Sequence, residues 1–332
     1  MRQRPCLFVH IPVHKTGSTA LQQTLCCNEP WLNDQQVTYL PGFTKDFQHA
    51  CLAAQLGDGL RSVLELMRQE ANGYSVIVST EQLHLLEDVL ISDFIGTLTE
   101  VFADHDITFV IYLRRQDDAF SSYYNQIVKF GTTTDTIAQA FSLYSRFFNY
   151  ERYLDLLQKT MRQTDTLLVR MYDRNTLVNQ DIVSDFFSAI GIDHSLEVRL
   201  PQLINPSLER SVLKLKHAMN FHLDDAPVDL LQSLAGVLSD VSCGINNGNP
   251  DTNALTALER DLIMASYADS NRRMANQYLG GVSFSSDMRP APSYESSLEI
   301  VLPAVLARLS RYFFHIITEP SSGSDGTDNP KS

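Results

Sequence analysis

Four short apolar runs dominate the pattern of hydrophobic and polar positions along this chain. Each has the length of a strand and is continuous rather than alternating, and they lie at 7–11, 74–80, 107–113 and 166–171. Continuous apolar strands are typical of a parallel sheet that is covered by helices on both faces. The pattern therefore predicts an α/β fold with a mostly parallel central sheet.

Helical spacing of apolar residues fills most of the chain between these runs. We expect helices at 19–25, 47–71 with a break at 57–59, 93–102, 114–130, 136–148, 150–162 and 178–190. Leu60, Val63, Leu64 and Met67 form an apolar stripe, which indicates a core face. The segment 28–45 contains three turn-prone residues and is expected to be a loop, with Trp31 as a core anchor.

Beyond residue 171 the sequence contains no further strand pattern. Helices are expected at 206–220, 228–238, 254–278 and 298–316, and the Gly- and Asn-rich segment 244–250 is expected to be a loop. The last residues, 319–332, are rich in Ser, Gly, Asp and Pro and are expected to be disordered. We therefore expect one domain over residues 1–318, with a helical C-terminal portion from about residue 206.

Composition and charge narrow the function classes. The chain has 332 residues, 44% hydrophobic and 20% charged, which is ordinary for a globular protein. Its formal net charge of −13 disfavours general binding to nucleic acid or to an anionic membrane. No uncharged run approaches the length of a membrane span, and the five cysteines lack the spacing of a zinc site. A cytoplasmic protein without a metal is expected, and nothing indicates its oligomeric state.

Candidate chemistry first appears directly after the first apolar run. The segment His14-Lys15-Thr16-Gly17-Ser18-Thr19 joins this strand to the following helix. Backbone N–H groups at a helix start attract anions, Lys15 adds a charge, the hydroxyls add donors, and Gly17 permits close approach. The segment therefore predicts a phosphate-binding loop, although a plain polar turn remains the alternative for so short a motif.

Two more candidates follow the second and third strands. Glu81 comes directly after one, and Arg114, with Ser122 eight positions later, comes directly after the other. Because the carboxyl ends of parallel strands lie at one edge of the sheet, we expect the three segments to meet in one cleft. A P-loop for NTP hydrolysis needs its lysine after the last glycine, whereas Lys15 precedes Gly17. This order argues against an ordinary NTP-binding loop.

The segments HIPVHKTGSTALQ and VIYLRRQDDAFSSYYNQIVKFG together resemble the PAPS-dependent sulfotransferase superfamily, in its bacterial carbohydrate-type branch. Weaker likeness extends over roughly 270 residues, but only these two motifs are specific. The resemblance implies a three-layer α/β/α fold of the P-loop type. It also implies transfer of a sulfuryl group from PAPS to a hydroxyl acceptor, with release of PAP, and it favours a sugar or glycoconjugate as that acceptor.

The resemblance also assigns residue roles. It places His14, Lys15, Thr16, Gly17, Ser18 and Thr19 around the 5′-phosphosulfate and Arg114 with Ser122 on the 3′-phosphate, without a metal. Lys15 would stabilise the leaving group, and Glu81 stands where related enzymes have a general base. Glu81 is equally suited to capping a helix, and His14 and His84 are competing candidates for the base.

Two other functions remain open. The first is an ATP-dependent kinase of the P-loop type, which predicts dependence on Mg²⁺. The second is a nucleotide- or glycan-binding protein that has the fold but does not turn over substrate. Binding of PAP in the presence of EDTA separates the first alternative from a sulfotransferase, and sulfate transfer from PAPS separates the second.

Overall fold

The computed structural model describes residues 4–13, 16–81, 83–193, 206–223, 226–245, 251–284 and 301–310. Residue contacts divide the chain into two compact units. Unit 1 comprises Met1–Tyr124, Asp135–Asn205 and Leu255–Ala291, and unit 2 comprises Asn125–Thr134, Pro206–Ala254 and Pro292–Ser332. The C-terminal portion expected to be helical from about residue 206 therefore contributes to both units.

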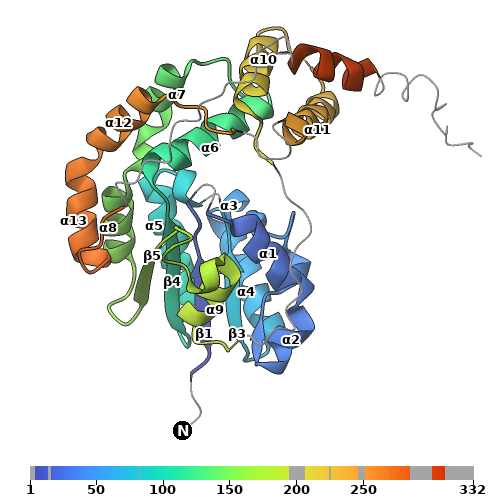
Figure 1. Cartoon of the computed structure of the whole chain (residues 1–332). Helices are drawn as coiled ribbons and strands as arrows, with labels where there is room; N and C mark the ends of the chain where they lie inside the picture. Colours follow the sequence, from blue (N-terminus) through green and yellow to red (C-terminus); the bar gives the residue numbers. More distant parts are fainter. Residues whose placement is uncertain are drawn as a thin grey trace, which may run out of the picture. The chain divides into compact units, whose positions relative to one another are not determined.

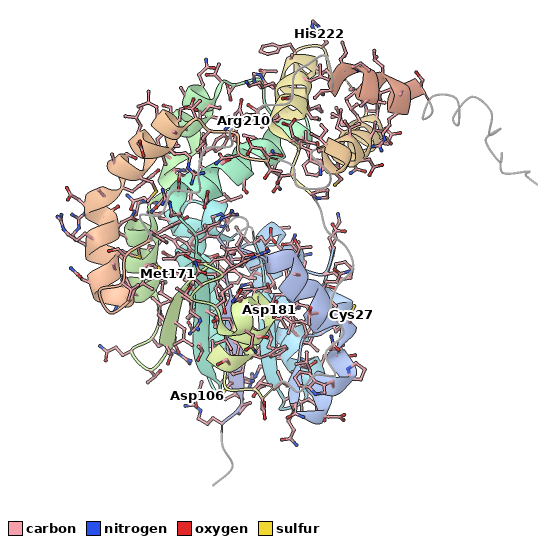
Figure 2. All side chains as sticks on the ribbon, viewed as in Figure 1. Cys27, Asp106, Met171, Asp181, Arg210 and His222 are labelled. Atoms are coloured by element: carbon pink, nitrogen blue, oxygen red, sulfur yellow. The ribbon has the colours of Figure 1, made fainter. Side chains whose placement is uncertain are left out.

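A five-stranded sheet lies at the centre of unit 1. Its strands are β1 (Cys6–His10), β2 (Val37–Thr38), β3 (Ser75–Ser79), β4 (Asp106–Leu113) and β5 (Thr166–Met171), in the order β2-β3-β1-β4-β5. Every pair of neighbours is parallel, so all the strands begin at one edge and end at the other. Figure 2 labels Asp106 where β4 begins and Met171 where β5 ends. The four predicted strands are confirmed.

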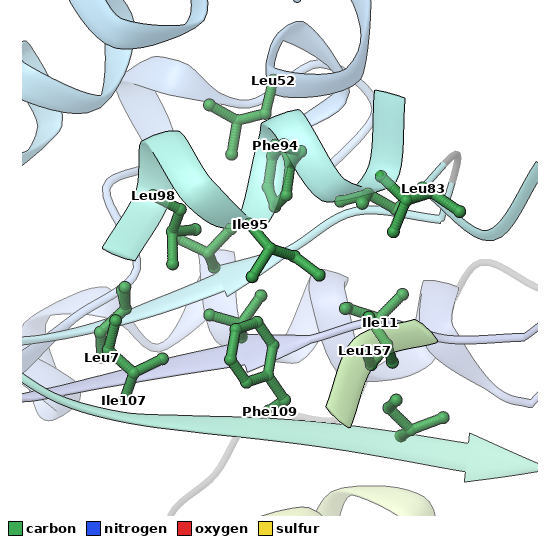
Figure 3. Packing of buried hydrophobic residues seen from close by; sticks show 14 of the residues in the cluster. Leu7, Ile11, Leu52, Leu83, Phe94, Ile95, Leu98, Ile107, Phe109 and Leu157 are labelled. Atoms are coloured by element: carbon green, nitrogen blue, oxygen red, sulfur yellow. The ribbon is translucent and has the colours of Figure 1, made fainter. Parts of the chain in front are cut away.

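One face of the sheet is covered by α4 (Asp58–Ala71), α5 (Asp88–Val101) and α8 (Tyr150–Thr160). Phe94, Ile95 and Leu98 of α5 lie over Leu7 and Phe109 of the sheet (Figure 3). The predicted stripe of α4 belongs to this core, where Leu60, Leu64 and Met67 are fully buried and Val63 packs beside them.

The opposite face is covered by α1 (Ser18–Cys27), α2 (Glu29–Asp34) and α9 (Ile182–Ala189) (Figure 1). Phe8 and Val110 point to this face because side chains alternate along a strand, and they meet Leu21 of α1 and Phe186 of α9. Trp31 lies at the margin of this core, with its ring 5.4 Å from that of Phe187. Two covered faces make a three-layer α/β/α architecture, which confirms the predicted fold class.

The other helices of unit 1 follow the loops between these elements. They are α3 (Ala50–Ala54), α6 (Gln116–Lys129), α7 (Ile137–Tyr144), α12 (Ala257–Ser266) and α13 (Ala268–Tyr278), and the end of α6 belongs to unit 2. Short 3₁₀ turns lie at Pro41–Phe43, Leu83–Leu85, Ser145–Phe148 and Val178–Gln180.

Several expectations about these elements were wrong in detail, among them the start of α5, which is Asp88 rather than residue 93. The expected loop 28–45 contains α2, which begins with Pro30 in its first turn, and the two-residue strand β2. Proline suits this position because the first N–H groups of a helix have no partner within it. The helix expected at 178–190 begins only at Ile182, because the Asp181 side chain accepts the Ser184 N–H at 2.8 Å and caps it.

The helix expected at 254–278 is divided at Tyr267. There is no Gly or Pro at the break, so local propensity gives no sign of it. The Tyr267 hydroxyl donates to the Ser145 carbonyl at 2.7 Å, and its ring packs on Phe141. This tertiary contact accompanies the backbone departure that separates α12 from α13.

Unit 2 contains α10 (Arg210–Asn220), α11 (Val228–Gly244), the end of α6 and a helical stretch at 301–310. The Asn125 amide exchanges hydrogen bonds with the backbone of Leu208, at 2.7 and 2.9 Å, and Lys129 donates to the Pro206 carbonyl at 2.9 Å. The expected tail 319–332 and most of the expected loop 244–250 lie outside the described residues. Within the described part of the chain, no helix is both long enough and apolar enough to cross a membrane.

Candidate functional site

Strand order determines where a ligand would bind in unit 1. After β1 the chain goes to β2 on one side of the sheet, and after β4 it goes to β5 on the other side. Strands β1 and β4 are neighbours, and loops that leave neighbouring strands in opposite directions open a crevice at the carboxyl edge of the sheet. The segment that follows β1 and the segment that begins with Arg114 lie at this edge, as the sequence predicted.

The loop after β1 ends at Gly17, which is the N-cap of α1. Its φ of 74° lies in the left-handed region, and the Gly17 carbonyl accepts the Leu21 N–H at 3.2 Å as the first bond of the helix. The N–H groups of Ser18 and Thr19 therefore precede the first intrahelical donor and remain available to an anion. His14 and Lys15 lie outside the described residues, so their predicted roles stay predictions.

The hydroxyls of this loop have different surroundings. Thr16 is fully buried, and its Oγ1 donates to the Val13 carbonyl at 2.9 Å, which closes the loop from within. Thr19 is exposed in the first turn of α1. Ser18 is nearly buried and donates its hydroxyl to the Glu81 carboxylate. Thr19 thus presents an exposed hydroxyl at the start of α1, whereas the buried Ser18 hydroxyl is already bonded to Glu81.

Glu81 meets the loop through this bond to Ser18, although the two residues are 63 positions apart in the chain. The Glu81 N–H donates to the Gln48 amide oxygen at 3.3 Å, and the side chain is only partly buried. The carboxylate therefore lies beside the anion loop and remains accessible to solvent. The structure brings these two predicted site residues together.

A buried polar network, which the sequence did not predict, lies next to the contact between Ser18 and Glu81. Ser79 Oγ is 2.8 Å from His10 Nδ1 and accepts the Gln22 amide at 2.9 Å, while the Ser79 N–H donates to His49 Nδ1 at 3.2 Å. Gln22 lies one helical turn after Ser18, and Ser79 lies two residues before Glu81. The network therefore ties α1 to the end of β3, directly behind the contact between Ser18 and Glu81.

Burial keeps two histidines of this region neutral. It lowers the pKa of His10 to about 3, and it lowers the pKa of His84, in the 3₁₀ turn after Glu81, to about 4. The ring of His10 also packs edge-on against Tyr112 and Phe186. His84 is buried, whereas the Glu81 carboxylate is partly exposed beside the loop, so access to an acceptor favours Glu81 over His84 as a general base.

The two arginines after β4 have different partners. Arg115 forms a two-pronged ion pair with the buried Asp117, at 2.9 and 3.0 Å, and Asp117 also pairs with Arg260 of α12 at 2.8 Å. Arg114 instead directs Nη1 toward Ser122 Oγ at 3.4 Å, at the long end of the hydrogen-bond range. Its own carbonyl accepts the Tyr150 hydroxyl at 2.8 Å, which fixes the backbone at this point.

The predicted pairing of Arg114 with Ser122 is therefore a spatial contact as well as a spacing in the sequence. Both side chains are partly exposed, so an anion can reach them. A guanidinium and a hydroxyl side by side form a suitable receptor for a phosphate group, because the planar fork donates two parallel bonds.

Tyr172 is a further residue of this edge that the sequence did not single out. It follows β5 directly, and its side chain lies against Gly17. A Cβ atom built on Gly17 would lie 3.0 Å from the Tyr172 hydroxyl oxygen and 3.2 Å from Cγ2 of Ile182. The available signal was its position, because Tyr172 follows its strand as Arg114 follows β4.

These residues make the carboxyl edge of the sheet suited to a ligand with two anionic groups. One group would meet the start of α1 and the other would meet Arg114 and Ser122, with the Glu81 carboxylate beside the first.

In comparisons with known proteins, no family model matches the chain. An uncharacterised protein from Archaeoglobus fulgidus is 26% identical over 171 residues, which are 52% of this chain and 45% of that protein. The match thus covers less than half the length of that relative, whose name states no activity.

Proposed function

We propose that this protein is a PAPS-dependent sulfotransferase that transfers a sulfuryl group to a hydroxyl acceptor. One observation carries the proposal: two segments whose residues suit the binding of anions follow the neighbouring strands β1 and β4 at a single edge of the sheet. PAPS carries a phosphosulfate at its 5′ position and a phosphate at its 3′ position, and so offers one anionic group to each segment. The resemblance of the two motifs to this superfamily supports the same assignment.

The donor nucleotide fits the residues at this edge of the sheet. The loop ends on a positive-φ glycine at a helix start, and Arg114 lies beside a hydroxyl at the second segment. In the proposal, the N–H groups of Ser18 and Thr19 bind the 5′-phosphate, and Arg114 with Ser122 binds the 3′-phosphate. Lys15 would stabilise the charge on the leaving phosphate oxygen. The bound donor supplies the activated sulfuryl group, and the protein supplies orientation and a base.

Glu81 is the proposed general base for the acceptor hydroxyl. Its contact with Ser18 keeps the carboxylate beside the anion loop, which is where an acceptor has to approach the donor. The same contact indicates that the donor binds before the acceptor. A phosphate at the start of α1 would compete for the Ser18 hydroxyl, and like charge would move Glu81 away from the loop toward the acceptor.

The acceptor class rests on the resemblance, which favours a sugar or glycoconjugate. The net charge of −13 disfavours a highly sulfated polymer, because such a chain would meet an acidic surface over most of the protein. We therefore propose the hydroxyl of a neutral or weakly charged sugar as the first acceptor to test. A cytoplasmic location remains part of the proposal.

Calorimetric binding of PAP in the presence of EDTA tests the donor site. We expect Arg114→Ala to weaken PAP roughly 10- to 150-fold, because a hydrogen-bonded charged group contributes about 1.5–3 kcal/mol. Binding of adenosine 5′-phosphate should change little, because it lacks the 3′-phosphate. Arg272→Ala is the matched control, because Arg272 is highly exposed in α13 and its ion pair, with Asp269, lies on its own helix.

The same experiment separates the alternatives. Binding of ATP with Mg²⁺ in preference to PAP would contradict the proposal and favour a kinase. Tight PAP binding without sulfate transfer from labelled PAPS to p-nitrophenyl glycosides would favour a non-catalytic relative. With transfer established, Glu81→Gln should lower kcat by about 10²–10⁴-fold while PAP affinity stays the same, since a positioned base acts on the chemical step.

A further inference from the structure

Tyr172 contacts both halves of the proposed nucleotide site. Its backbone N–H donates to the Leu113 carbonyl at 2.7 Å, and Leu113 is the residue directly before Arg114. Its side chain lies against Gly17, where an added Cβ would be 3.0 Å from the hydroxyl oxygen and 3.1 Å from the ring atom Cε2. A single residue thus links the loop before α1 to the segment that carries Arg114.

The contact at Gly17 is a close approach that a larger residue would prevent. Gly191 has the same φ of 74°, yet nothing would lie within 4 Å of a Cβ built there. Gly17 therefore differs from Gly191 by its neighbours and not by its backbone conformation. Because Gly17 has no side chain, the loop backbone can rest directly against the Tyr172 ring.

The other contact of Tyr172 continues the sheet. Strands β4 and β5 are paired from Thr108 with Thr166 to Leu113 with Met171, and the bond from Tyr172 to Leu113 extends this pairing by one residue. The backbone of Tyr172 is thereby held at a fixed place beside the start of the Arg114 segment. Its ring, which reaches Gly17, then holds the loop at a fixed place relative to Arg114.

This geometry matters for a ligand with two anionic groups. The 5′ and 3′ groups of one nucleotide have a limited range of separations, and a two-part site gains affinity when its halves are held at a matching distance. If one half moves, the second group no longer binds without an additional cost.

On the basis of the proposed function, we propose that Tyr172 is a positioning residue that sets the distance between the two phosphate subsites. It thereby determines the preference of the site for a nucleotide with both a 5′ and a 3′ phosphate. The ring carries this role, because a Cβ built on Gly17 would lie 3.1 Å from Cε2, almost as close as the 3.0 Å to the hydroxyl oxygen.

Calorimetric binding measures this preference as the dissociation constant of adenosine 5′-phosphate divided by the dissociation constant of PAP. In Tyr172→Leu we expect the ratio to fall at least tenfold, almost entirely through weaker PAP binding, with adenosine 5′-phosphate within about threefold of its original affinity. Tyr172→Phe should keep the ratio within about twofold. A purely structural role would weaken both nucleotides equally.

Ile182→Ala is the matched control, because Ile182 also touches Gly17 but lies in α9, and the bond to Leu113 is made by Tyr172. It should lower thermal stability and leave the ratio unchanged. If Tyr172→Leu does not fold, Tyr172→Met replaces it, with the same expected loss of preference. An unchanged ratio in the variant that folds would overturn the inference, whereas a wild-type protein without preference for PAP would overturn the proposed function itself.

Discussion

Replacement of Gly17 by alanine tests the local geometry of the loop independently of any ligand. Two effects oppose this substitution. Alanine disfavours the left-handed φ of 74°, and its Cβ would approach the Tyr172 hydroxyl to 3.0 Å and Ile182 Cγ2 to 3.2 Å. Gly191→Ala is a matched control, because Gly191 has the same φ of 74° and open space around it.

The two effects can be estimated separately. A left-handed conformation costs an L-residue about 1–2 kcal/mol, offset by about 0.4–1 kcal/mol from the reduced entropy of the unfolded chain. Gly191→Ala should therefore cost about 1 kcal/mol. Gly17→Ala adds the strain of forcing atoms into a packed region, about 1–3 kcal/mol, so its total should be about 2–4 kcal/mol.

Urea unfolding followed by tryptophan fluorescence measures both losses. Trp31 is the only tryptophan of the chain, and it packs on Phe187 in unit 1, so it reports the unit that contains Gly17. In the double variant Gly17→Ala with Tyr172→Leu, the loss should be smaller than the sum of the single losses, because the crowding is relieved. If Gly17→Ala is no more destabilising than Gly191→Ala, the contact with Tyr172 does not constrain the loop.

Two further predictions concern buried ionisable side chains. Burial lowers the pKa values of three histidines below the ordinary value of 6.5, to about 3 for His10 and about 4 for His49 and His84, so between these values the unfolded chain binds protons that the folded protein excludes. The free energy of unfolding should therefore fall on acidification, by about 2 kcal/mol per histidine between pH 7 and pH 5. His84→Gln should remove about a third of this dependence on pH, as measured by urea titrations at both pH values. An unchanged dependence on pH in this variant would contradict the neutral burial of His84. Asp117→Asn should cost about 3–5 kcal/mol in the same assay because it leaves two arginines without their buried carboxylate, whereas Asp269→Asn, at an exposed pair, should cost less than about 1 kcal/mol; similar losses would refute the argument.

The sequence determined the layers of unit 1 because those depend on local pattern. Continuous apolar runs of strand length, separated by amphipathic segments, are sufficient to predict a parallel sheet with two covered faces. Elements with weak local signals were missed. Strand β2 has only two residues and pairs at the edge of the sheet, so no periodicity marks it.

The sequence also indicated the two halves of the candidate site, because residues after parallel strands must lie at one edge. It did not indicate what connects the halves. Tyr172 joins the loop to the Arg114 segment through the register of β4 and β5, and no spacing in the chain shows that its ring meets Gly17.

Some contacts between polar groups were also decided by the tertiary structure alone. The buried Asp117 binds Arg115, which is two residues away, and also Arg260 of α12, which no local pattern indicates. Similarly, Ser18 and Glu81 meet only because α1 and the end of β3 pack at the same edge. The sequence by itself thus determined the fold class and the segments that carry charge. The contacts of Ser18 with Glu81 and of Asp117 with Arg260 join residues far apart in the chain, and only the folded structure decided them.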